Sequence, residues 1–351
     1  MGSSQAPSIA DRRLAGDTAI SPIHMVSRPA PVQLVVSVAL AVMAVMWISD
    51  PAGVRDLVLL YFGTPHERYA ASVRRGDAGA TTAGRIWLES AERSLAQPAP
   101  VTLPESRRLS VSSNDPKAST FVMTVRRGQR YVADVRMNGQ VEPVFVDVFE
   151  RDGSGALRHV ANRAPGDAVV SMEVRADTDY VLRVQPEMFR SGEMTVAVRT
   201  EPTLQIPVEG ATAKNVQSFF GAARDGGRRE HHGVDIFAAR RTPVRAAASG
   251  IVTSVGTNGL GGNVVWITRP TRGESHYYAH LDQQLVTPGT YVREGDVIGL
   301  VGNTGNARGT APHLHFGIYT AGGAVDPLPY ISAPPVRRTA RKATRAPVAG
   351  E

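Results

Sequence analysis

The sequence predicts a mainly β protein. An N-terminal transmembrane helix and a short helical segment come first, then a small antiparallel β-sandwich and a C-terminal antiparallel β-sheet domain. Three observations support this prediction. Short runs rich in valine, isoleucine, threonine and aromatic residues recur after residue 101, and glycine, proline or aspartate bounds each run, as expected of strands. An uncharged apolar run and a stretch of helix formers precede them. Six of the nine histidines lie in the last β segment.

The polar and proline-bearing residues 1–31 predict a disordered leader, whose true start could be Met1 or Met25. Residues 34–48 carry no charge, and we predict a transmembrane signal anchor at 32–49, at the short end of the roughly 20 residues that span a bilayer. Three arginines precede this run, so the positive-inside rule places the bulk of the chain outside the cytoplasm. The lack of an Ala-x-Ala cleavage site favours an uncleaved anchor over a signal peptide.

Residues 54–97 predict a juxtamembrane helical segment that ends at Pro98 and Pro100. Residues 101–205 then predict the β-sandwich, because several short strands follow one another at regular spacing. This segment contains no cluster of functional groups, and we interpret it as a spacer or binding module. Its expected strands are 121–125, 131–135, 144–149, 180–184 and 194–198.

Composition and charge restrict the possible functions. The 351 residues are enough for two or three domains, and 42% of them are apolar. The net charge of +7 is partly concentrated in residues 331–351, which we interpret as a basic disordered tail that either attracts anionic envelope polymers or lipid headgroups or has no fixed partner. No nucleic-acid-binding motif is present, so we predict no nucleic-acid partner. The absence of cysteine means that any metal must be bound by His, Asp or Glu.

Residues 206–330 predict the last β domain, in which glycine is dense and the strands are short. His313 and His315 lie two apart in a strand and therefore share one face, while Leu314 and Phe316 on the other face anchor the strand in a core. The expected strands of this domain are 250–255, 264–267, 276–281, 297–301 and 313–319.

Two further histidine groups lie in the same domain. His231 precedes Asp235 by four residues, and both could bind one ion if Gly233 lets the backbone curve between them. In the strand 276–281, alternation places His276, Tyr278 and His280 on one face.

Together the three groups supply three neutral or anionic ligands and spare imidazoles. Zinc suits such a ligand set, since catalytic zinc sites typically use three protein ligands and leave the fourth position to water. The metal lowers the pKa of that water to about 7. Histidines outside the ligand set could then act as a base and as a donor to the oxyanion.

The spacings His231-x-x-x-Asp235 and His313-x-His315 resemble the signature of the lysostaphin-like, or LytM-type, zinc metalloendopeptidases. The resemblance covers roughly residues 206–330 and implies a β-sheet core of the duplicated hybrid-motif type. It also implies one Zn²⁺ held by His231, Asp235 and His315. Further stretches that carry the resemblance are 232–236, 250–252, 278–281, 295–299 and 302–305.

The same resemblance assigns catalytic roles to His280 and His313, as base and transition-state stabiliser, without deciding which residue has which role. His232 and His276 do not belong to the family set, and we interpret them as supporting or surface residues. The hybrid motif also resembles biotinyl and lipoyl carriers, but the single lysine of residues 206–330, Lys214, lies in a loop before the barrel, which argues against a carrier.

The resemblance predicts a metalloendopeptidase that hydrolyses peptide cross-links of peptidoglycan in cell-wall remodelling, with stem peptides as its substrate. With the anchor at 32–49, this predicts a single-pass protein of the bacterial inner membrane whose C-terminal domains lie in the periplasm or extracytoplasmic space. The alternative is a non-catalytic envelope regulator that binds and activates other wall hydrolases. Such regulators have lost metal ligands, whereas the ligand set is complete here.

Overall fold

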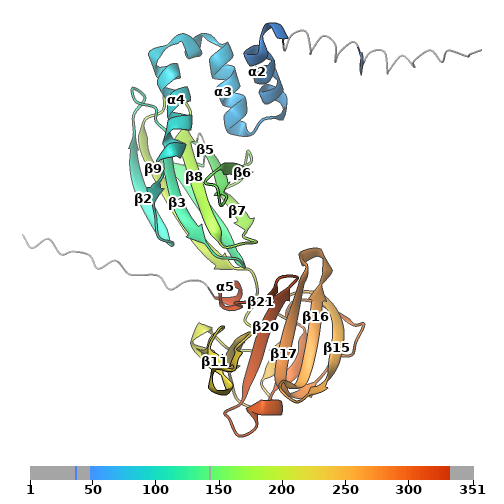
Figure 1. Ribbon diagram of the computed structural model, residues 1–351. Coiled ribbons are helices and arrows are strands. Elements are labelled where there is room, and N and C mark those ends of the chain that lie inside the picture. The colour runs from blue at the N-terminus through green and yellow to red at the C-terminus, as the bar shows by residue number, and fades with distance from the viewer. Residues whose placement is uncertain (1–35, 38–47, 142–143, 333–351) are drawn as a thin grey trace, which may run out of the picture. The chain divides into compact units, whose positions relative to one another are not determined.

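The computed structural model describes residues 36–37, 48–141 and 144–332 (Figure 1). The predicted leader at 1–31 lies outside the described residues, as do all but two residues of the predicted tail at 331–351. Most of the predicted membrane anchor at 32–49 also lies outside them. Among the residues that are described, no helix is long and apolar enough to cross a membrane.

The N-terminal part of the described chain is helical. Thr64 caps α3 through a capping box with Glu67, and α4 ends just before Pro98, as the sequence predicts. Trp87 of α4 is fully buried and donates its indole N–H to the carbonyl of Pro186 at 2.8 Å, which fixes this helix on the following β domain. The helices are α2 (Pro51–Phe62), α3 (Pro65–Arg75) and α4 (Thr82–Ala96).

Two sheets follow the helices and enclose one apolar core. One sheet has the order β1-β3-β8-β5-β6 and the other the order β2-β9-β4-β7, and buried side chains from both sheets form a single cluster. The turn at residues 126–128 joins β3 of one sheet to β4 of the other. The strands are β1 (Ala99–Pro100), β2 (Glu105–Val111), β3 (Ser119–Val125), β4 (Gln129–Met137), β5 (Val144–Arg151), β6 (Leu157–Asn162), β7 (Val169–Glu173), β8 (Thr178–Pro186) and β9 (Gly192–Pro202).

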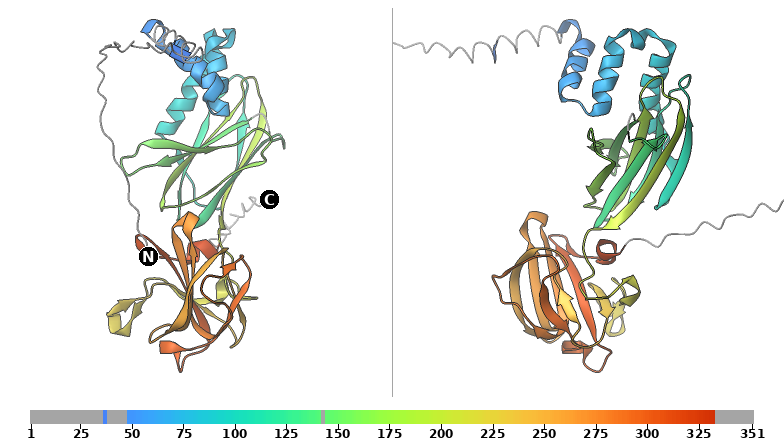
Figure 2. Two further views of the ribbon diagram at one scale, coloured as in Figure 1. Left: turned by 90° about the vertical axis from the view of Figure 1, so that its right-hand side faces the viewer. Right: turned by 180° about the vertical axis from the view of Figure 1, so that it is seen from behind.

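The C-terminal part, which is coloured yellow to red in Figure 2, is built on a ten-stranded sheet. The main path of this sheet runs β10-β13-β20-β17-β16-β15-β18. Strands β14 and β19 pair beside this path, β21 pairs with β20, and β11 and β12 form a separate hairpin. A mainly β chain is therefore confirmed. The longer strands are β13 (Val234–Phe237), β15 (Gly250–Asn258), β16 (Gly262–Arg269), β17 (Glu274–Gln284), β19 (Val297–Val301) and β20 (His313–Thr320).

Six short strands complete the described part of this domain, and the helical turn α5 (Leu328–Ile331) closes the described chain. The sequence pattern did not indicate these short strands, because two or three residues are too few to show alternation. They are β10 (Val216–Ser218), β11 (Ala223–Arg224), β12 (Arg229–Glu230), β14 (Pro243–Arg245), β18 (Tyr291–Val292) and β21 (Gly323–Val325).

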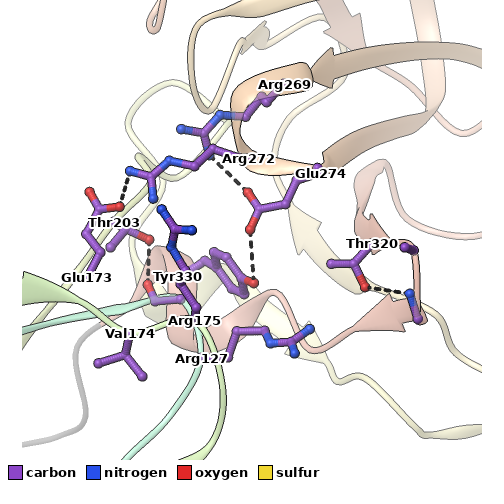
Figure 3. A pocket seen from close by; sticks show the side chains of 14 residues that line it. Arg127, Glu173, Val174, Arg175, Thr203, Arg269, Arg272, Glu274, Thr320 and Tyr330 are labelled. Carbon is purple, nitrogen blue, oxygen red and sulfur yellow. Dashed lines mark hydrogen bonds and ion pairs between the residues drawn. The ribbon is translucent and has the colours of Figure 1, made fainter. Parts of the chain in front are cut away.

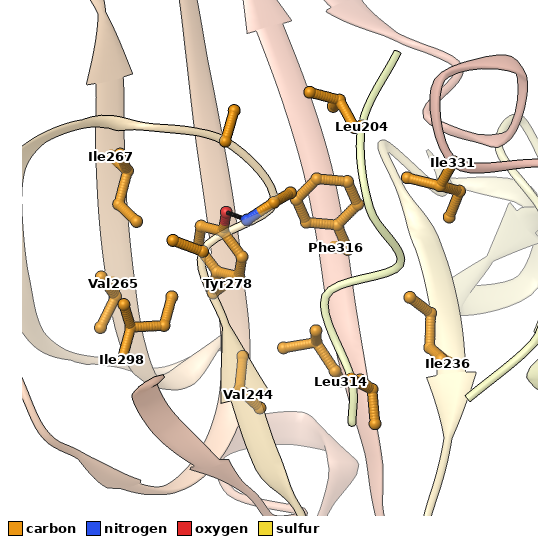
Figure 4. Packing of buried hydrophobic residues seen from close by; sticks show 14 of the residues in the cluster. Leu204, Ile236, Val244, Val265, Ile267, Tyr278, Ile298, Leu314, Phe316 and Ile331 are labelled. Carbon is orange, nitrogen blue, oxygen red and sulfur yellow. Dashed lines mark hydrogen bonds between the residues drawn. The ribbon is translucent and has the colours of Figure 1, made fainter. Parts of the chain in front are cut away.

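One face of the ten-stranded sheet packs into an apolar core (Figure 4). Leu314 and Phe316 of β20 are fully buried there, as their alternation with the two histidines predicts. Tyr278 is also fully buried, and its hydroxyl accepts a hydrogen bond from the backbone N–H of Ala247 at 2.9 Å. This core leaves the opposite face of β20 free to carry functional groups.

The predicted alternation in β17 is wrong at His280. His280 has a positive φ of 62°, and the pairing with β16 shows an extra residue at this point, since Val265 lies opposite Tyr278 but Asn263 lies opposite Leu281. Such a β-bulge turns the following side chain to the other face. As a result Tyr278 points into the core, while His280 lines a groove on the side of His315.

Candidate metal centre and groove

Three adjacent strands place one row of residues side by side. Asp235 of β13 pairs with Ser218 of β10 on one side and with His315 of β20 on the other. His315 in turn pairs with Ala279 of β17, the residue next to His280. Because directly paired residues of antiparallel strands project on the same face, this row brings residues from distant parts of the chain to one spot.

The predicted ligands His231, Asp235 and His315 converge at that spot. Asp235 Oδ1 lies 3.0 Å from His231 Nε2 and 3.1 Å from His315 Nδ1, and the two ring nitrogens are 2.9 Å apart. One ligand atom from each residue lies within 4.8 Å of the others, and the three residues form the single such cluster found among the described residues. The geometry therefore brings together the three residues that the sequence predicts as metal ligands.

The chemistry of these atoms suits a cation. His231 donates Nδ1–H to the carbonyl of Phe219 at 2.9 Å, which leaves a lone pair on Nε2 of the neutral ring. Burial lowers the pKa of His315 and favours its neutral form. Two lone pairs and a carboxylate oxygen at this spacing repel one another unless a cation lies among them, so the residues fit a zinc ion.

Gly233 makes room for this cluster in a way that the sequence did not indicate. We expected this glycine to let the backbone curve, but Gly233 is not among the glycines with a positive φ. A Cβ at this position would instead lie 2.7 Å from Cε1 and Nε2 of His315 and 2.5 Å from the carbonyl oxygen of Phe316. Close packing of β13 against the His315 ring is therefore the reason that a side chain does not fit here.

His280 and His313, the predicted catalytic residues, stand next to the metal cluster. Their ring centroids are 5.1 Å apart, and that of His280 is 5.9 Å from that of His315. His280 donates Nδ1–H to the carbonyl of Thr304 at 2.9 Å, and His313 donates Nδ1–H to the carbonyl of Ala311 at 2.8 Å. Each ring therefore keeps a lone pair on Nε2, where it can take up a proton.

The two histidines are held in the same way, so the geometry leaves open which is the base and which the stabiliser. Burial, with smaller contributions from His315 and His313, lowers the pKa of His280 to about 4. His280 is therefore neutral at pH 7 and can accept a proton.

All five of these residues line one groove of about 1070 Å³. The hairpin β11–β12 contributes one part of its lining, and the loops before β16 and before β20 contribute others. Three aromatic side chains from neighbouring strands also line it. Trp266, Tyr277 and Tyr319 lie in mutual contact. The ring centroid of Tyr277 is 4.5 Å from that of Trp266 and 6.3 Å from that of Tyr319. The groove exceeds the usual volume of a small-molecule pocket and suits an extended substrate.

The two histidines outside the predicted set have different positions. His232 is exposed, lines the groove and stacks on Phe220, in line with a surface role. His276 is fully buried in the core beside Phe316, which excludes a surface role. Burial lowers the pKa of His276 to about 3, and neither ring nitrogen has a hydrogen-bond partner within the described part of the chain.

A second pocket, of about 360 Å³, shares no lining residue with the groove (Figure 3). Both glutamates that line it are paired with arginines, Arg269 with Glu274 at 3.1 Å and Arg272 with Glu173. No histidine lines it. We therefore place the candidate chemistry in the groove.

Sequence reasoning missed Arg224. Its Nη2 donates to Oδ2 of Asp235 at 2.9 Å, and the same group donates to Ser218 Oγ. Nothing in the local pattern singles out this arginine, since the two-residue strand β11 shows no periodicity and the contact is formed by strand pairing.

The fold and the site together define a β-sheet domain in which two histidines and one aspartate could hold a metal ion beside two further histidines. Residues 229–327 match Peptidase family M23. This stretch is therefore an M23 peptidase domain, homologous to the lysostaphin-like and LytM-type endopeptidases, as the resemblance in sequence predicted.

Three curated relatives illustrate the match. The L-Ala--D-Glu endopeptidase of Bacillus subtilis is 39% identical over 139 residues, which cover 36% of this chain and 42% of the relative. The DD-carboxypeptidase/endopeptidase Mpg of Neisseria meningitidis is 45% identical over 100 residues, which cover 28% of this chain and 22% of the relative. Lysostaphin of Staphylococcus simulans is 37% identical over 108 residues, which cover 29% of this chain and 22% of the relative. The chain thus spans less than half the length of these relatives.

Among solved structures, the catalytic domain of lysostaphin from Staphylococcus simulans matches with a TM-score of 0.31 and 33% identity. The match covers 34% of this chain and 97% of that one.

Proposed function

We propose that this protein is a zinc-dependent endopeptidase that hydrolyses peptide cross-links of peptidoglycan during cell-wall remodelling. The observation that carries the proposal is the convergence of His231 Nε2, Asp235 Oδ1 and His315 Nδ1 beside two histidines with free Nε2 atoms. Relatives named L-Ala--D-Glu endopeptidase and glycyl-glycine endopeptidase support peptide-bond hydrolysis. L-Ala–D-Glu is a bond of peptidoglycan stem peptides, which favours that polymer as the substrate.

In this proposal His231, Asp235 and His315 hold the zinc ion. When bound, the ion supplies Lewis acidity and an activated water. His280 and His313 hold and transfer protons at Nε2 on the same side of the groove, one as base and the other as stabiliser of the developing charge. Both rings are buried in the wall of the groove, which limits their contact with bulk water, and the volume of about 1070 Å³ accommodates an extended peptide.

The membrane anchor and the extracytoplasmic location also form part of the proposal. They rest on the uncharged run at 34–48 and the arginines before it. Protease treatment of intact spheroplasts checks this point, because the C-terminal domain is digested only if it lies outside the cytoplasm.

The test of the proposed activity is mass analysis of fragments that the zinc-loaded protein releases from purified peptidoglycan. We expect cleavage at a peptide bond, and the fragment masses identify which bond is cut. His315→Ala should abolish both zinc binding and fragment release. His280→Ala and His313→Ala should keep zinc but lower the rate by about 10²-fold or more, as expected when a proton-transfer group is lost. Undiminished release by a metal-free preparation of His315→Ala would contradict the proposal.

The regulator alternative makes the opposite prediction. A regulator would release no fragments by itself but would activate a separate wall hydrolase. The complete ligand cluster gives no support to that alternative.

A further inference from the structure

We propose that Arg224 is a positioning residue that restricts Asp235 to binding the metal through one oxygen. The inference rests on the proposed metal site. It starts from the two oxygens of Asp235, which have different surroundings. Oδ1 lies among the ligand nitrogens, 3.0 Å from His231 Nε2 and 3.1 Å from His315 Nδ1, whereas Oδ2 accepts a hydrogen bond from Arg224 Nη2 at 2.9 Å.

The guanidinium group is well placed to keep this arrangement. An arginine–carboxylate hydrogen bond is charge-assisted and roughly twice as strong as a neutral one. The side chain of Asp235 is only 10% exposed and that of Arg224 31% exposed, so water competes weakly for Oδ2.

Arg224 is itself anchored by its neighbours. The same Nη2 group donates to Ser218 Oγ, and Ser218 is the strand partner of Asp235 in β10. Ser218 Oγ also lies 3.3 Å from His231 Nδ1. Arg224, Ser218 and Asp235 therefore form one connected set, and Arg224 cannot move without disturbing atoms next to two predicted ligands.

The consequence concerns the open coordination position. A carboxylate can bind zinc through one oxygen or two, and a second oxygen would occupy the position that a catalytic site leaves to water. With Oδ2 engaged by Arg224, only Oδ1 faces the ligand cluster. Arg224 thus acts on the reaction through Asp235 and does not need to touch the substrate. Partners of ligating carboxylates typically contribute 10–100-fold to metal affinity or activity.

Cobalt(II) replacement of zinc in the full chain provides the test, because the visible absorption of cobalt weakens as its coordination number rises. We expect Arg224→Gln to bind cobalt but to show clearly weaker bands than the wild type, and its kcat on peptidoglycan fragments to fall 10–100-fold with little change in KM. Arg224→Met, which keeps the alkyl stem, is the second variant in case Arg224→Gln does not fold. Arg224→Lys, which restores one cationic donor, should recover part of the band intensity.

The matched control is Arg229→Gln. Arg229 lies on β12 of the same hairpin and lines the same groove, but it pairs with Asp225 at 3.0 Å and not with a predicted ligand, so the cobalt spectrum of this variant should equal that of the wild type. Wild-type bands in folded Arg224→Gln or Arg224→Met overturn the inference, even if activity falls, because Arg224 would then act on the substrate. Failure of the wild type to bind cobalt would instead contradict the metal site itself. The two failures are therefore distinguishable.

Discussion

At the scale of single residues, the site depends on how tightly its atoms are packed. Gly233 shows this best, because the ring of His315 occupies the space that a side chain would need. His66 is a titratable side chain that is buried outside the groove. Its Nε2–H donates to Gln185 Oε1 at 2.7 Å, and its ring stacks on Trp87. Both positions lead to predictions.

Gly233→Ala should displace His315 and disrupt the metal cluster. The new methyl group would lie 2.7 Å from the His315 ring, so we expect a destabilisation of about 1–3 kcal/mol and zinc affinity at least about 10-fold lower. Chelator competition and urea unfolding measure the two effects. Gly256→Ala is the control, because a Cβ there meets no atom within 4 Å. Equal zinc affinity in both variants would mean that the close packing at Gly233 has no role.

His66 should make the stability of the chain pH-dependent. Burial lowers the pKa of His66 to about 4, whereas the unfolded chain has the ordinary value near 6.5. The unfolded state therefore binds more protons between these values, and the stabilisation that is present above pH 6.5 is lost as the pH falls to 4, by at most about 3 kcal/mol.

The measurement is the urea unfolding free energy from pH 4 to pH 7, with chelator present so that metal release does not contribute. His276, also buried, adds to the slope in every variant that retains it. His66→Gln should show a shallower slope than the wild type. An unchanged slope would show that His66 is not held neutral.

At the scale of elements, two strands position the two histidines that we propose as catalytic by different means. In β20 simple alternation places His313 and His315 above the core residues Leu314 and Phe316. In β17 a bulge with His280 in the left-handed region is needed to turn that side chain toward the groove. The backbone of β17 is therefore strained at His280, one of the two histidines proposed as catalytic.

The bulge predicts an asymmetry between two similar substitutions. His280→Val should lower the unfolding free energy by about 1–2 kcal/mol more than His313→Val, because a β-branched residue tolerates the positive φ at position 280 poorly. The comparison is well matched, since both substitutions remove one hydrogen bond from Nδ1 to a backbone carbonyl and both positions are buried. Equal losses in urea unfolding would argue against strain in β17.

At the scale of the whole molecule, the described chain contains separate apolar cores. The cluster around Leu182 and Val196 belongs to the sandwich, and the cluster around Phe316 and Ile236 belongs to the M23 domain, with no residue in common. A ligand bound in the groove therefore directly stabilises only the M23 domain, which contains the core around Phe316 and Ile236.

Calorimetry should show this separation as two thermal transitions. Zinc at 100 times its dissociation constant stabilises the state that binds it by about 2.7 kcal/mol, so the transition of the M23 domain should rise by several degrees while that of the sandwich stays in place. His315→Ala should remove the shift. A shift of equal size in both transitions would mean that the two cores unfold as one unit.

The sequence by itself determined the mainly β class and the likeness to the lysostaphin-like endopeptidases, and it predicted the five histidine and aspartate positions of the candidate site, because these depend on local alternation and on spacing within short motifs. The tertiary structure decided what lies around them. His231 and His315 meet only because β13 pairs with β20, and the orientation of His280 depends on an extra residue opposite β16. The contact of Arg224 with Asp235 and the tight fit at Gly233 depend on the same long-range pairing, which no local pattern specifies.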